Sequence, residues 1–242
     1  NDWRRGVVQE IHSVSADRIE PPCEHRRAGC GGCDWQHVSI AAQLPAKLAI
    51  VVDALRRTAK LPDADVRAGA SVPDRAYRTT IRVVGDANDR PAYRIERSND
   101  TVPATGCLIT HPALVGVLDG LIVPSGLEVT LRVSAATGDL TALWDPQLGD
   151  VIGLPGHVGV GERATLHEVV AGHRFRVAAG SFFQSGPAAA ELLVDAVGRA
   201  APELDSASRV LDAYAGVGLF AVAATAPNSE VVAVESAHCA VA

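Results

Sequence analysis

Four cysteines of this chain could share one metal site. Cys23, Cys30 and Cys33 form a C-x6-C-x2-C pattern, and two glycines between the last pair let backbone amides turn toward the sulfurs. A loop this short has little hydrophobic core to hold it, so three thiolates on it indicate a bound metal. Tetrahedral zinc and a four-iron cluster both need a fourth ligand. Cys107, in the loop ATGCLITHP, is the best candidate.

The identity of this metal stays open from the residues alone. His25 and His37 compete with Cys107 for the fourth position, and a histidine there would favour zinc. Cysteine spacing is equally compatible with zinc and with iron–sulfur. A disulfide with free thiols is the alternative without metal, and nothing in the sequence suggests the oxidising compartment that it needs. Cys239 stands apart in the small, apolar ESAHCAVA, which favours a structural thiol over a nucleophile.

A glycine-rich turn forms the second group of chemically suggestive residues. A predicted strand ends at Asp212, and Gly216 and Gly218 follow where the chain turns into a helix. Glycines let the backbone approach a ligand, and Glu235 at the end of the next strand can accept both ribose hydroxyls of an adenosine. GVGLFA also matches the G-x-G-x-x-A pattern of nicotinamide dinucleotide sites. The Asp212 carboxylate would repel a pyrophosphate and suits an ammonium group, so S-adenosylmethionine is favoured over NAD. A turn that binds no ligand is the remaining alternative.

Hydrophobic periodicity predicts the elements that position these residues. Residues 38–61 have helical spacing, with Ser39 as the cap and Pro62 as the stop. Residues 76–178 are rich in short alternating runs typical of antiparallel strands, interrupted by a helix at 112–121. The predicted strands are 79–85, 91–97, 127–133, 139–144, 165–170 and 173–178. A helix at 188–200 then precedes strand, glycine turn, helix and strand, so a domain boundary is predicted between Ser181 and Gly186. Residues 6–11 are read as a short strand and 23–37 as a loop without regular structure.

Composition bounds the class of protein. The chain has 242 residues, of which 48% are hydrophobic and 21% charged, which is typical of globular structure. No apolar run is long enough for a membrane helix, and we expect a cytoplasmic protein without membrane contact. The net charge of −6 weakens any claim that this piece alone binds nucleic acid tightly. The chain lacks methionine and stops in the first half of a βαβ pattern, so we interpret it as a fragment cut at both ends.

Three segments together resemble the RNA uracil-C5 methyltransferases. CEHRRAGCGGCDWQHVSIAAQLPAKLAIV resembles their cluster-binding segment, and GSFFQSGPAAAELL resembles their F-x-Q-x-N segment. RVLDAYAGVGLFAVAATA with VVAVE resembles their D-L-Y-C-G-x-G cofactor motif and acidic ribose ligand. The order and spacing agree across nearly the whole chain, which makes the combination far more specific than any single motif.

This resemblance implies a fold of mixed α+β and α/β class. It implies that residues 1–20 are the end of a TRAM-like RNA-binding β-barrel, that 21–180 form a central antiparallel iron–sulfur domain, and that 181–242 begin a Rossmann-like methyltransferase domain. The implied [4Fe-4S] ligands are Cys23, Cys30, Cys33 and Cys107. The implied S-adenosylmethionine positions are Gln184, Tyr214, Leu219 and Glu235. The chain departs from the family at Leu219, where a polar residue is usual, at Ala215, and at Ser185 and Gly186.

The implied reaction is methylation of uracil C5 in RNA. In the family a cysteine thiolate adds to C6 and so activates C5 toward the methyl group. That nucleophile and the base follow further along the family's sequence, so we expect this fragment, a monomer, to catalyse nothing alone. Ribosomal RNA, 23S in particular, is favoured over tRNA as the substrate, and Arg78, Arg82 and Arg94 are candidate contacts to its backbone. The alternatives are a zinc-dependent RNA-binding module without catalysis and an NAD-dependent Rossmann oxidoreductase.

Overall fold

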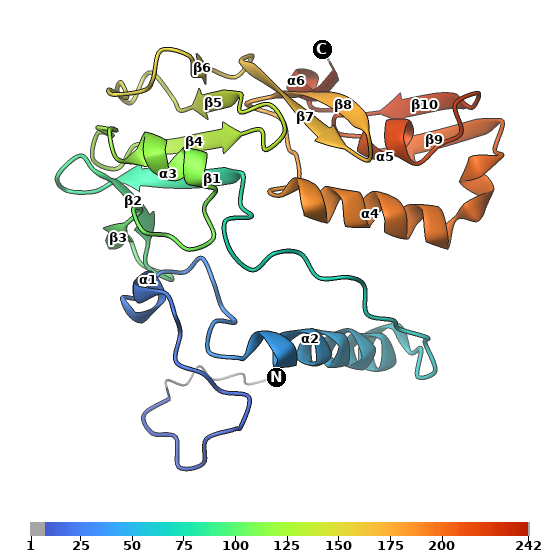
Figure 1. Cartoon of the computed structure of the whole chain (residues 1–242), viewed down its shortest axis with the longest axis horizontal. Helices are drawn as coiled ribbons and strands as arrows, with labels where there is room; N and C mark the ends of the chain where they lie inside the picture. The colour runs from blue at the N-terminus through green and yellow to red at the C-terminus, as the bar shows by residue number, and fades with distance from the viewer. Residues whose placement is uncertain (1–7, 242) are drawn as a thin grey trace.

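A six-stranded, mostly antiparallel sheet forms the larger part of the molecule (Figure 1). The structure is a computed structural model that describes residues 8–241. The strand order is β3-β2-β1-β4-β5-β6, and only the short edge pair β5–β6 is parallel. The strands are β1 (Thr80–Gly85), β2 (Pro91–Arg94), β3 (Thr101–Pro103), β4 (Glu128–Val133), β5 (Leu140–Leu143) and β6 (Gly159–Val160).

The first hydrophobic core lies on one face of this sheet. Ile81 and Val83 on β1 pair with Leu131 and Val129 on the antiparallel β4, and all four are at most 3% exposed. Side chains two positions apart share a face of a strand, so this register presents one continuous apolar surface. Helix α3 (Pro112–Leu118) packs against β4 and closes the core.

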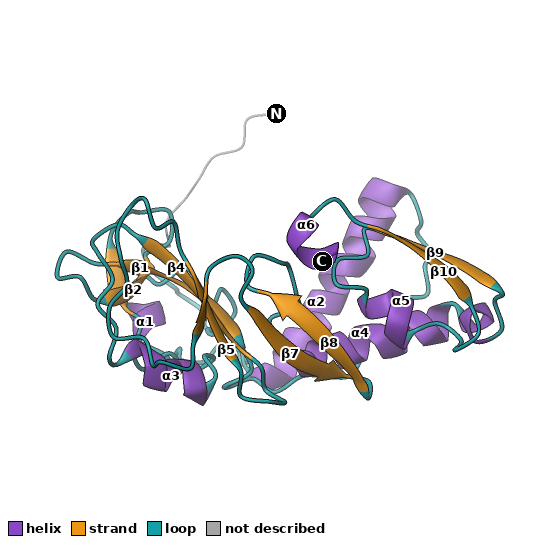
Figure 2. Cartoon of the chain, turned by 90° about the horizontal axis from the view of Figure 1, so that it is seen from above, coloured by secondary structure: helices purple, strands orange, loops and turns teal. Residues whose placement is uncertain are grey.

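A second core lies under the hairpin of β7 (Thr165–Val170) and β8 (His173–Ala178), seen from above in Figure 2. Helix α4 (Pro187–Ala200) and the short α5 (Leu219–Ala223) cover it. The hairpin, which the sequence groups with the antiparallel region, therefore shares its core with the helix beyond residue 186. The remaining elements are the 3-10 turn η2 (Pro202–Asp205), the parallel pair β9 (Arg209–Ala213) and β10 (Glu230–Val234), and α6 (His238–Val241).

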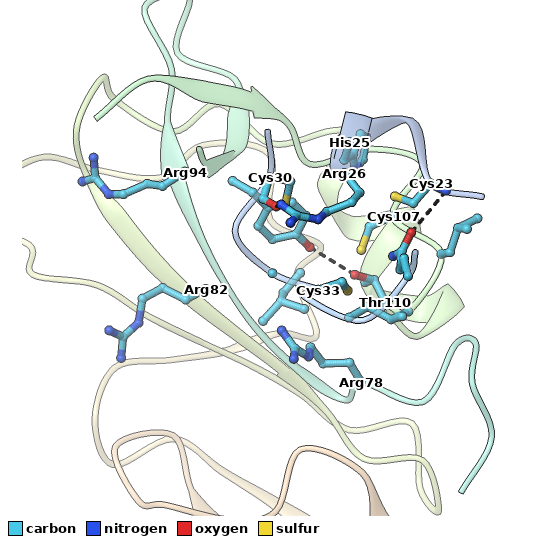
Figure 3. Close-up of a pocket in the computed structure, with 16 residues that line it drawn as sticks. Cys23, His25, Arg26, Cys30, Cys33, Arg78, Arg82, Arg94, Cys107 and Thr110 are labelled. Carbon is cyan, nitrogen blue, oxygen red and sulfur yellow. Dashed lines mark hydrogen bonds between the residues drawn. The ribbon is translucent and has the colours of Figure 1, made fainter. Parts of the chain in front are cut away.

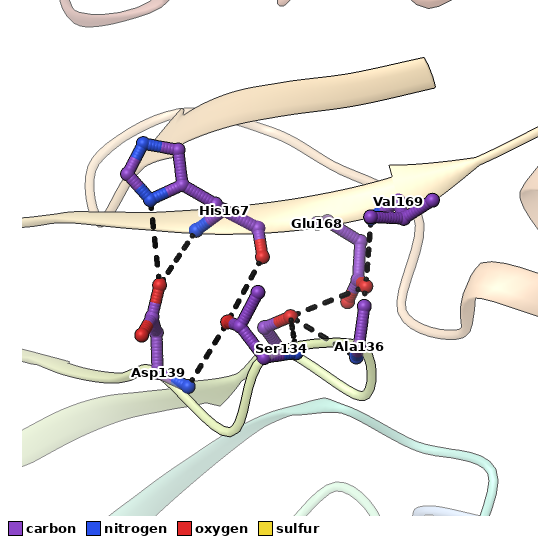
Figure 4. Close-up of polar contacts among 7 residues, drawn as sticks. Ser134, Ala136, Asp139, His167, Glu168 and Val169 are labelled. Carbon is purple, nitrogen blue, oxygen red and sulfur yellow. Dashed lines mark hydrogen bonds and ion pairs between the residues drawn. The ribbon is translucent and has the colours of Figure 1, made fainter. Parts of the chain in front are cut away.

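Two buried charged side chains fasten the hairpin to the large sheet. The guanidinium of Arg132 on β4 donates to the carbonyls of Ala178 (3.3 Å) and Ser181 (2.9 Å). The carboxylate of Glu168 on β7, which is 2% exposed, accepts hydrogen bonds from the turn that joins β4 to β5 (Figure 4). Buried charges are tolerated only when their hydrogen-bonding groups are satisfied, and both of these are.

The N-terminal part consists of the single turn α1 (Glu24–Arg27), the helix α2 (Ile40–Ala54) and a π-helical turn η1 (Leu55–Ala59). Ser39 occupies the N-cap position of α2, as predicted, although its side chain makes no capping hydrogen bond. No residue of α2 is buried, and Pro45 lies inside it.

The structure confirms the six predicted strands, the three predicted helices and the strand–turn–helix–strand order after residue 186. The prediction of a loop without regular structure at 23–37 is wrong at α1, where Ala28 donates to the carbonyl of Glu24 and closes one helical turn. The predicted strand at 6–11 lies partly outside the described residues, and its described part, 8–11, is not a strand. The edge strands β3 and β6 were missed because three and two residues are too few to show alternation. Within residues 8–241, no helix is long and apolar enough to cross a membrane.

Candidate functional site

The four predicted metal ligands, Cys23, Cys30, Cys33 and Cys107, line one cavity of about 240 Å³ (Figure 3). The first three come from the loop around α1, and Cys107 comes from the loop after β3. The structure thus brings together residues more than seventy positions apart in the sequence. His25 also lines the cavity, whereas the other histidine considered as a ligand, His37, does not.

Backbone pairing to the edge of the large sheet holds the cysteine loop in place. Gly31 donates to the carbonyl of Arg94 on β2 (3.4 Å), and Glu96 donates to the carbonyl of Gly29 (2.9 Å). A Cβ atom at Gly31 would lie 3.2 Å from the Cα of Glu96, so a side chain here would require the neighbouring backbone to shift by a few tenths of an ångström. The amide of Cys23 donates to the side-chain oxygen of Gln36 (3.3 Å).

A second set of backbone hydrogen bonds positions the loop that carries Cys107. Ala76 donates to the carbonyl of Leu108 (2.9 Å) and Arg78 to that of Ile109 (2.8 Å), while His111 donates back to the carbonyl of Arg78 (3.0 Å). The segment before β1 therefore runs beside the loop that carries Cys107, and it brings the side chain of Arg78 into the cysteine cavity.

Burial in the cavity disfavours the charged forms of the side chains that line it. Burial raises the pKa of the Cys30 and Cys33 thiols above the ordinary value, and the neighbouring Cys107 raises both further. Burial also raises the pKa of Tyr93, whose hydroxyl forms a hydrogen bond with that of Thr110 (3.1 Å). The Cys30 and Cys33 thiols are therefore neutral at pH 7 in the absence of metal, and a metal that binds these two must displace their protons.

Among residues 8–241, no group of three or more His, Cys, Asp or Glu side chains meets closely enough to hold a single metal ion. Tetrahedral zinc with bonds of about 2.3 Å requires sulfurs roughly 3.8 Å apart. The four sulfurs lie instead around the wall of a cavity. Two of the residues that line this cavity have a buried nitrogen without a hydrogen-bond partner among residues 8–241: His25 Nδ1 and Arg78 Nε. The donor set is chemically compatible with a multi-atom cluster in which each iron has its own thiolate.

The predicted cofactor turn lies at the carboxyl ends of the parallel strands β9 and β10. Gly216 and Gly218 have φ angles of +58° and +83°, the left-handed region that glycine adopts without strain. The amide of Gly216 donates to Glu235 Oε2 (2.7 Å), and that of Ala221 in α5 donates to Asp212 Oδ2 (3.0 Å). Both predicted carboxylates therefore brace the turn, a role that sequence reasoning missed.

The two carboxylates differ in how many further hydrogen bonds they can accept. The backbone amide of Ala237, followed by that of Gly216, holds the pKa of Glu235 below its ordinary value, so the group is ionised at neutral pH. An ionised carboxylate has about four acceptor sites. Glu235 accepts from three backbone amides and from the Ser236 hydroxyl (3.5 Å), whereas Asp212 accepts from one backbone amide. The sequence places an acidic residue at the end of each of two neighbouring strands. Both carboxylates also bind backbone amides of the turn, as anions do at turns and helix N-termini.

The other predicted cofactor positions differ in how far their side chains are exposed. Tyr214 is 93% exposed and has a φ of +66°, whereas Leu219 is 8% exposed and packs in the second core. Leu219 can therefore offer a ligand only its backbone. Gln184 is half-buried in the loop before α4.

The three candidate RNA-contacting arginines have different surroundings. Arg78 lines the cysteine cavity with its Nε buried, and Arg94 forms an ion pair with Glu128 (3.3 Å). Arg82 is exposed and makes no ion pair within the described part of the chain. Figure 3 shows the Arg82 and Arg94 side chains directed away from the cysteines. Sequence periodicity gave no signal for the different position of Arg78, because this residue precedes the strand.

No family model matches the sequence. Curated relatives do. The chain is 32% identical to an uncharacterized RNA methyltransferase of Streptomyces avermitilis, in a match that covers 90% of this chain and 57% of the relative. It is 33% identical to a second uncharacterized RNA methyltransferase, of Streptomyces coelicolor, over 90% of this chain and 54% of the relative. It is 30% identical to the 23S rRNA (uracil(1939)-C(5))-methyltransferase RlmD of Halomonas elongata, over 94% of this chain and 55% of the relative. The chain spans about half the length of the curated relatives it matches.

A solved structure has the same fold. The tRNA (uracil-54, C5)-methyltransferase of Pyrococcus abyssi, in complex with S-adenosyl-L-homocysteine, matches with a TM-score of 0.67 and 18% sequence identity. The match covers 96% of this chain and 62% of that one. Sequence relatives and fold agree, and they confirm the resemblance that the three sequence segments indicate.

Proposed function

We propose that this chain, similar over nearly its whole length to RNA uracil-C5 methyltransferases, is part of an enzyme that transfers a methyl group from S-adenosylmethionine to C5 of uracil in RNA. The observation that carries the proposal is the match of 90% or more of the chain to proteins named RNA methyltransferases, one of them specific for uracil C5. The cysteine cavity and the braced glycine turn are the two sites that such a protein would use.

The cofactor site is proposed at the carboxyl ends of β9 and β10. Glu235 would accept the ribose hydroxyls, Asp212 would face the ammonium group, and the backbone at Gly216 and Gly218 would approach the ligand closely. S-adenosylmethionine supplies an electrophilic methyl group when bound. Gln184 and Tyr214 would contribute side chains, and Leu219 only its backbone. The free acceptor capacity of Asp212 and the position of both carboxylates at the ends of two parallel strands support this assignment.

The cysteine cavity is proposed to hold a [4Fe-4S] cluster on Cys23, Cys30, Cys33 and Cys107. Support comes from the four cysteines that line one cavity. Residues 21–180 would then be a cluster-bearing RNA-binding domain, 181–242 the beginning of the methyltransferase domain, and 1–20 the end of a TRAM-like barrel. The cluster would join the cysteine loop around α1 to the loop that carries Cys107.

The proposed substrate is ribosomal RNA, and the protein would act as a monomer in the cytoplasm. The name of the Halomonas relative points to 23S rRNA, while the structural neighbour acts on tRNA. Arg82 is the best candidate for a phosphate contact because Arg94 is partly neutralised by Glu128 and Arg78 faces the cysteines.

Methylation of separate transcripts tests the function. Protein expressed from the complete gene is incubated with labelled S-adenosylmethionine and with 23S rRNA or tRNA transcripts, and the nucleosides are identified by mass spectrometry. We expect 5-methyluridine in the rRNA. Label at another atom of the base would exclude the proposed chemistry, and label in tRNA alone would replace the proposed substrate.

A further inference from the structure

The cysteine cavity contains a cation that no predicted role explains. Four arginines line it: Arg26, Arg78, Arg82 and Arg94. Three of them are accounted for. Arg26 donates to the carbonyl of Cys30 (3.3 Å) and lies 3.6 Å from a carboxylate oxygen of Glu96. Arg82 and Arg94 are exposed, and their side chains are directed away from the cysteines.

Arg78 differs because its Nε is buried without a hydrogen-bond partner. A guanidinium group has five donors and no acceptor, so the missing partner must be an acceptor. Leaving a buried donor of a charged group unsatisfied is costly, and native proteins rarely do it. An acceptor therefore belongs in this space when the protein is complete.

The side-chain oxygens that line the cavity each take part in one hydrogen bond. Gln36 accepts from the amide of Cys23 (3.3 Å), and the hydroxyls of Tyr93 and Thr110 bond to each other (3.1 Å). The four cysteine sulfurs are the other acceptors among the lining side chains. A neutral thiol is a weak acceptor, whereas a metal-bound thiolate or an inorganic sulfide carries negative charge and accepts a charge-assisted bond.

The backbone holds Arg78 in position for such a bond. Its amide and carbonyl both pair with the 109–111 segment, directly after Cys107 (2.8 Å and 3.0 Å). The side chain therefore starts from a fixed point beside one of the ligands, and little conformational entropy is lost when it binds. His25 Nδ1 is also buried and unpartnered, but a neutral imidazole nitrogen can be a donor or an acceptor, so it does not define its partner.

We propose that Arg78 donates hydrogen bonds to the sulfur atoms of the iron–sulfur site on its Cys33 and Cys107 side, and that it thereby raises the reduction potential of the cluster. A cluster with four thiolates is an anion, and one-electron reduction adds a further negative charge. A buried cation bonded to its sulfurs stabilises the reduced form more than the oxidised form. Arg78 is thus a positioning residue for the cluster, and this inference rests on the proposed cluster.

Reduction potentials test the inference. The protein is loaded anaerobically with iron and sulfide, and the cluster is titrated with dithionite while its electron paramagnetic resonance signal is followed. We expect Arg78→Met to lower the reduced-to-oxidised ratio at a given potential at least tenfold, which is about 59 mV for a one-electron couple. Arg94→Met is the matched control, because this arginine lines the same cavity but its exposed charge is screened by water, and we expect no shift.

The outcomes separate the inference from the proposed function. Equal potentials in Arg78→Met and Arg94→Met, with a cluster present in both, would overturn the role of Arg78 and leave the cluster intact. A wild-type protein that takes up zinc but no iron and sulfide would overturn both the proposed cluster and the role of Arg78. If Arg78→Met assembles no cluster, Arg78→Gln removes the charge and keeps a side-chain amide donor. A lowered potential in that variant supports the inference, and an unchanged one overturns it.

Discussion

Replacing Glu168 with alanine should loosen the connection between the two hydrophobic cores. The Glu168 carboxylate accepts from the hydroxyl of Ser134 (3.2 Å) and from the amides of Ala135 (3.1 Å) and Val169 (3.0 Å). Ser134 is 1% exposed, so its hydroxyl donor would be left buried without this acceptor. A buried unsatisfied donor costs about 1–3 kcal/mol, and each lost hydrogen bond that water can partly replace costs roughly 0.5–1.5 kcal/mol.

The expected loss for Glu168→Ala is therefore about 3 kcal/mol of unfolding free energy. For a chain of this length, that corresponds to a fall in Tm of roughly 6–12 °C. The assay is urea denaturation followed by circular dichroism, with metal content checked to be equal in all samples. Glu128→Ala is the control, because this glutamate lies on β4 but its ion pair with Arg94 is exposed, and such pairs contribute less than about 1 kcal/mol. Equal stability of the two variants would refute the reasoning.

Four further outcomes are expected. Cys30→Ser should lose most of its iron and acid-labile sulfide and unfold more readily, while Cys239→Ser should keep both, as measured by elemental analysis. Glu235→Ala should weaken S-adenosylmethionine binding roughly tenfold in calorimetry, and unchanged affinity would remove this residue from the site. Arg82→Gln should lower RNA affinity and flatten its salt dependence by about one charge without changing cofactor affinity, which filter binding at several salt concentrations would measure. The folded-state pKa of Glu235 is lower than its unfolded pKa of about 4.5. Its ionised form should therefore contribute to stability above that pH, and the contribution should disappear as pH falls through the folded-state pKa. A stability difference between wild type and Glu235→Gln that persists at pH 2 would contradict this.

The sequence was a good guide wherever the pattern was long and local. Six strands were predicted because their side chains alternate over four or more residues, as Ile81 and Val83 do on β1. Cys23, Cys30 and Cys33 were predicted as one group because they are close in sequence. Cys107 was predicted as the fourth member from its loop and from the family resemblance, and backbone pairs bring that loop to the same cavity.

Other features depend on contacts that no local pattern records. Arg78 was read as a surface arginine, yet the bridge to the loop after Cys107 turns it into the cysteine cavity. Leu219 was read as a cofactor position, yet its side chain belongs to the second core. Glu235 was placed at the correct strand end, but its hydrogen bond to Gly216 appears only once β9 and β10 are paired.

The measurement that tests the central claim most directly is the 5-methyluridine content of ribosomal RNA in the source organism. The gene is deleted, 23S rRNA and tRNA are purified separately, and their nucleosides are quantified by mass spectrometry, with the gene restored on a plasmid as control. The account predicts that one 5-methyluridine disappears from 23S rRNA, returns on complementation, and that tRNA is unchanged. An unaltered 5-methyluridine content in 23S rRNA would contradict it.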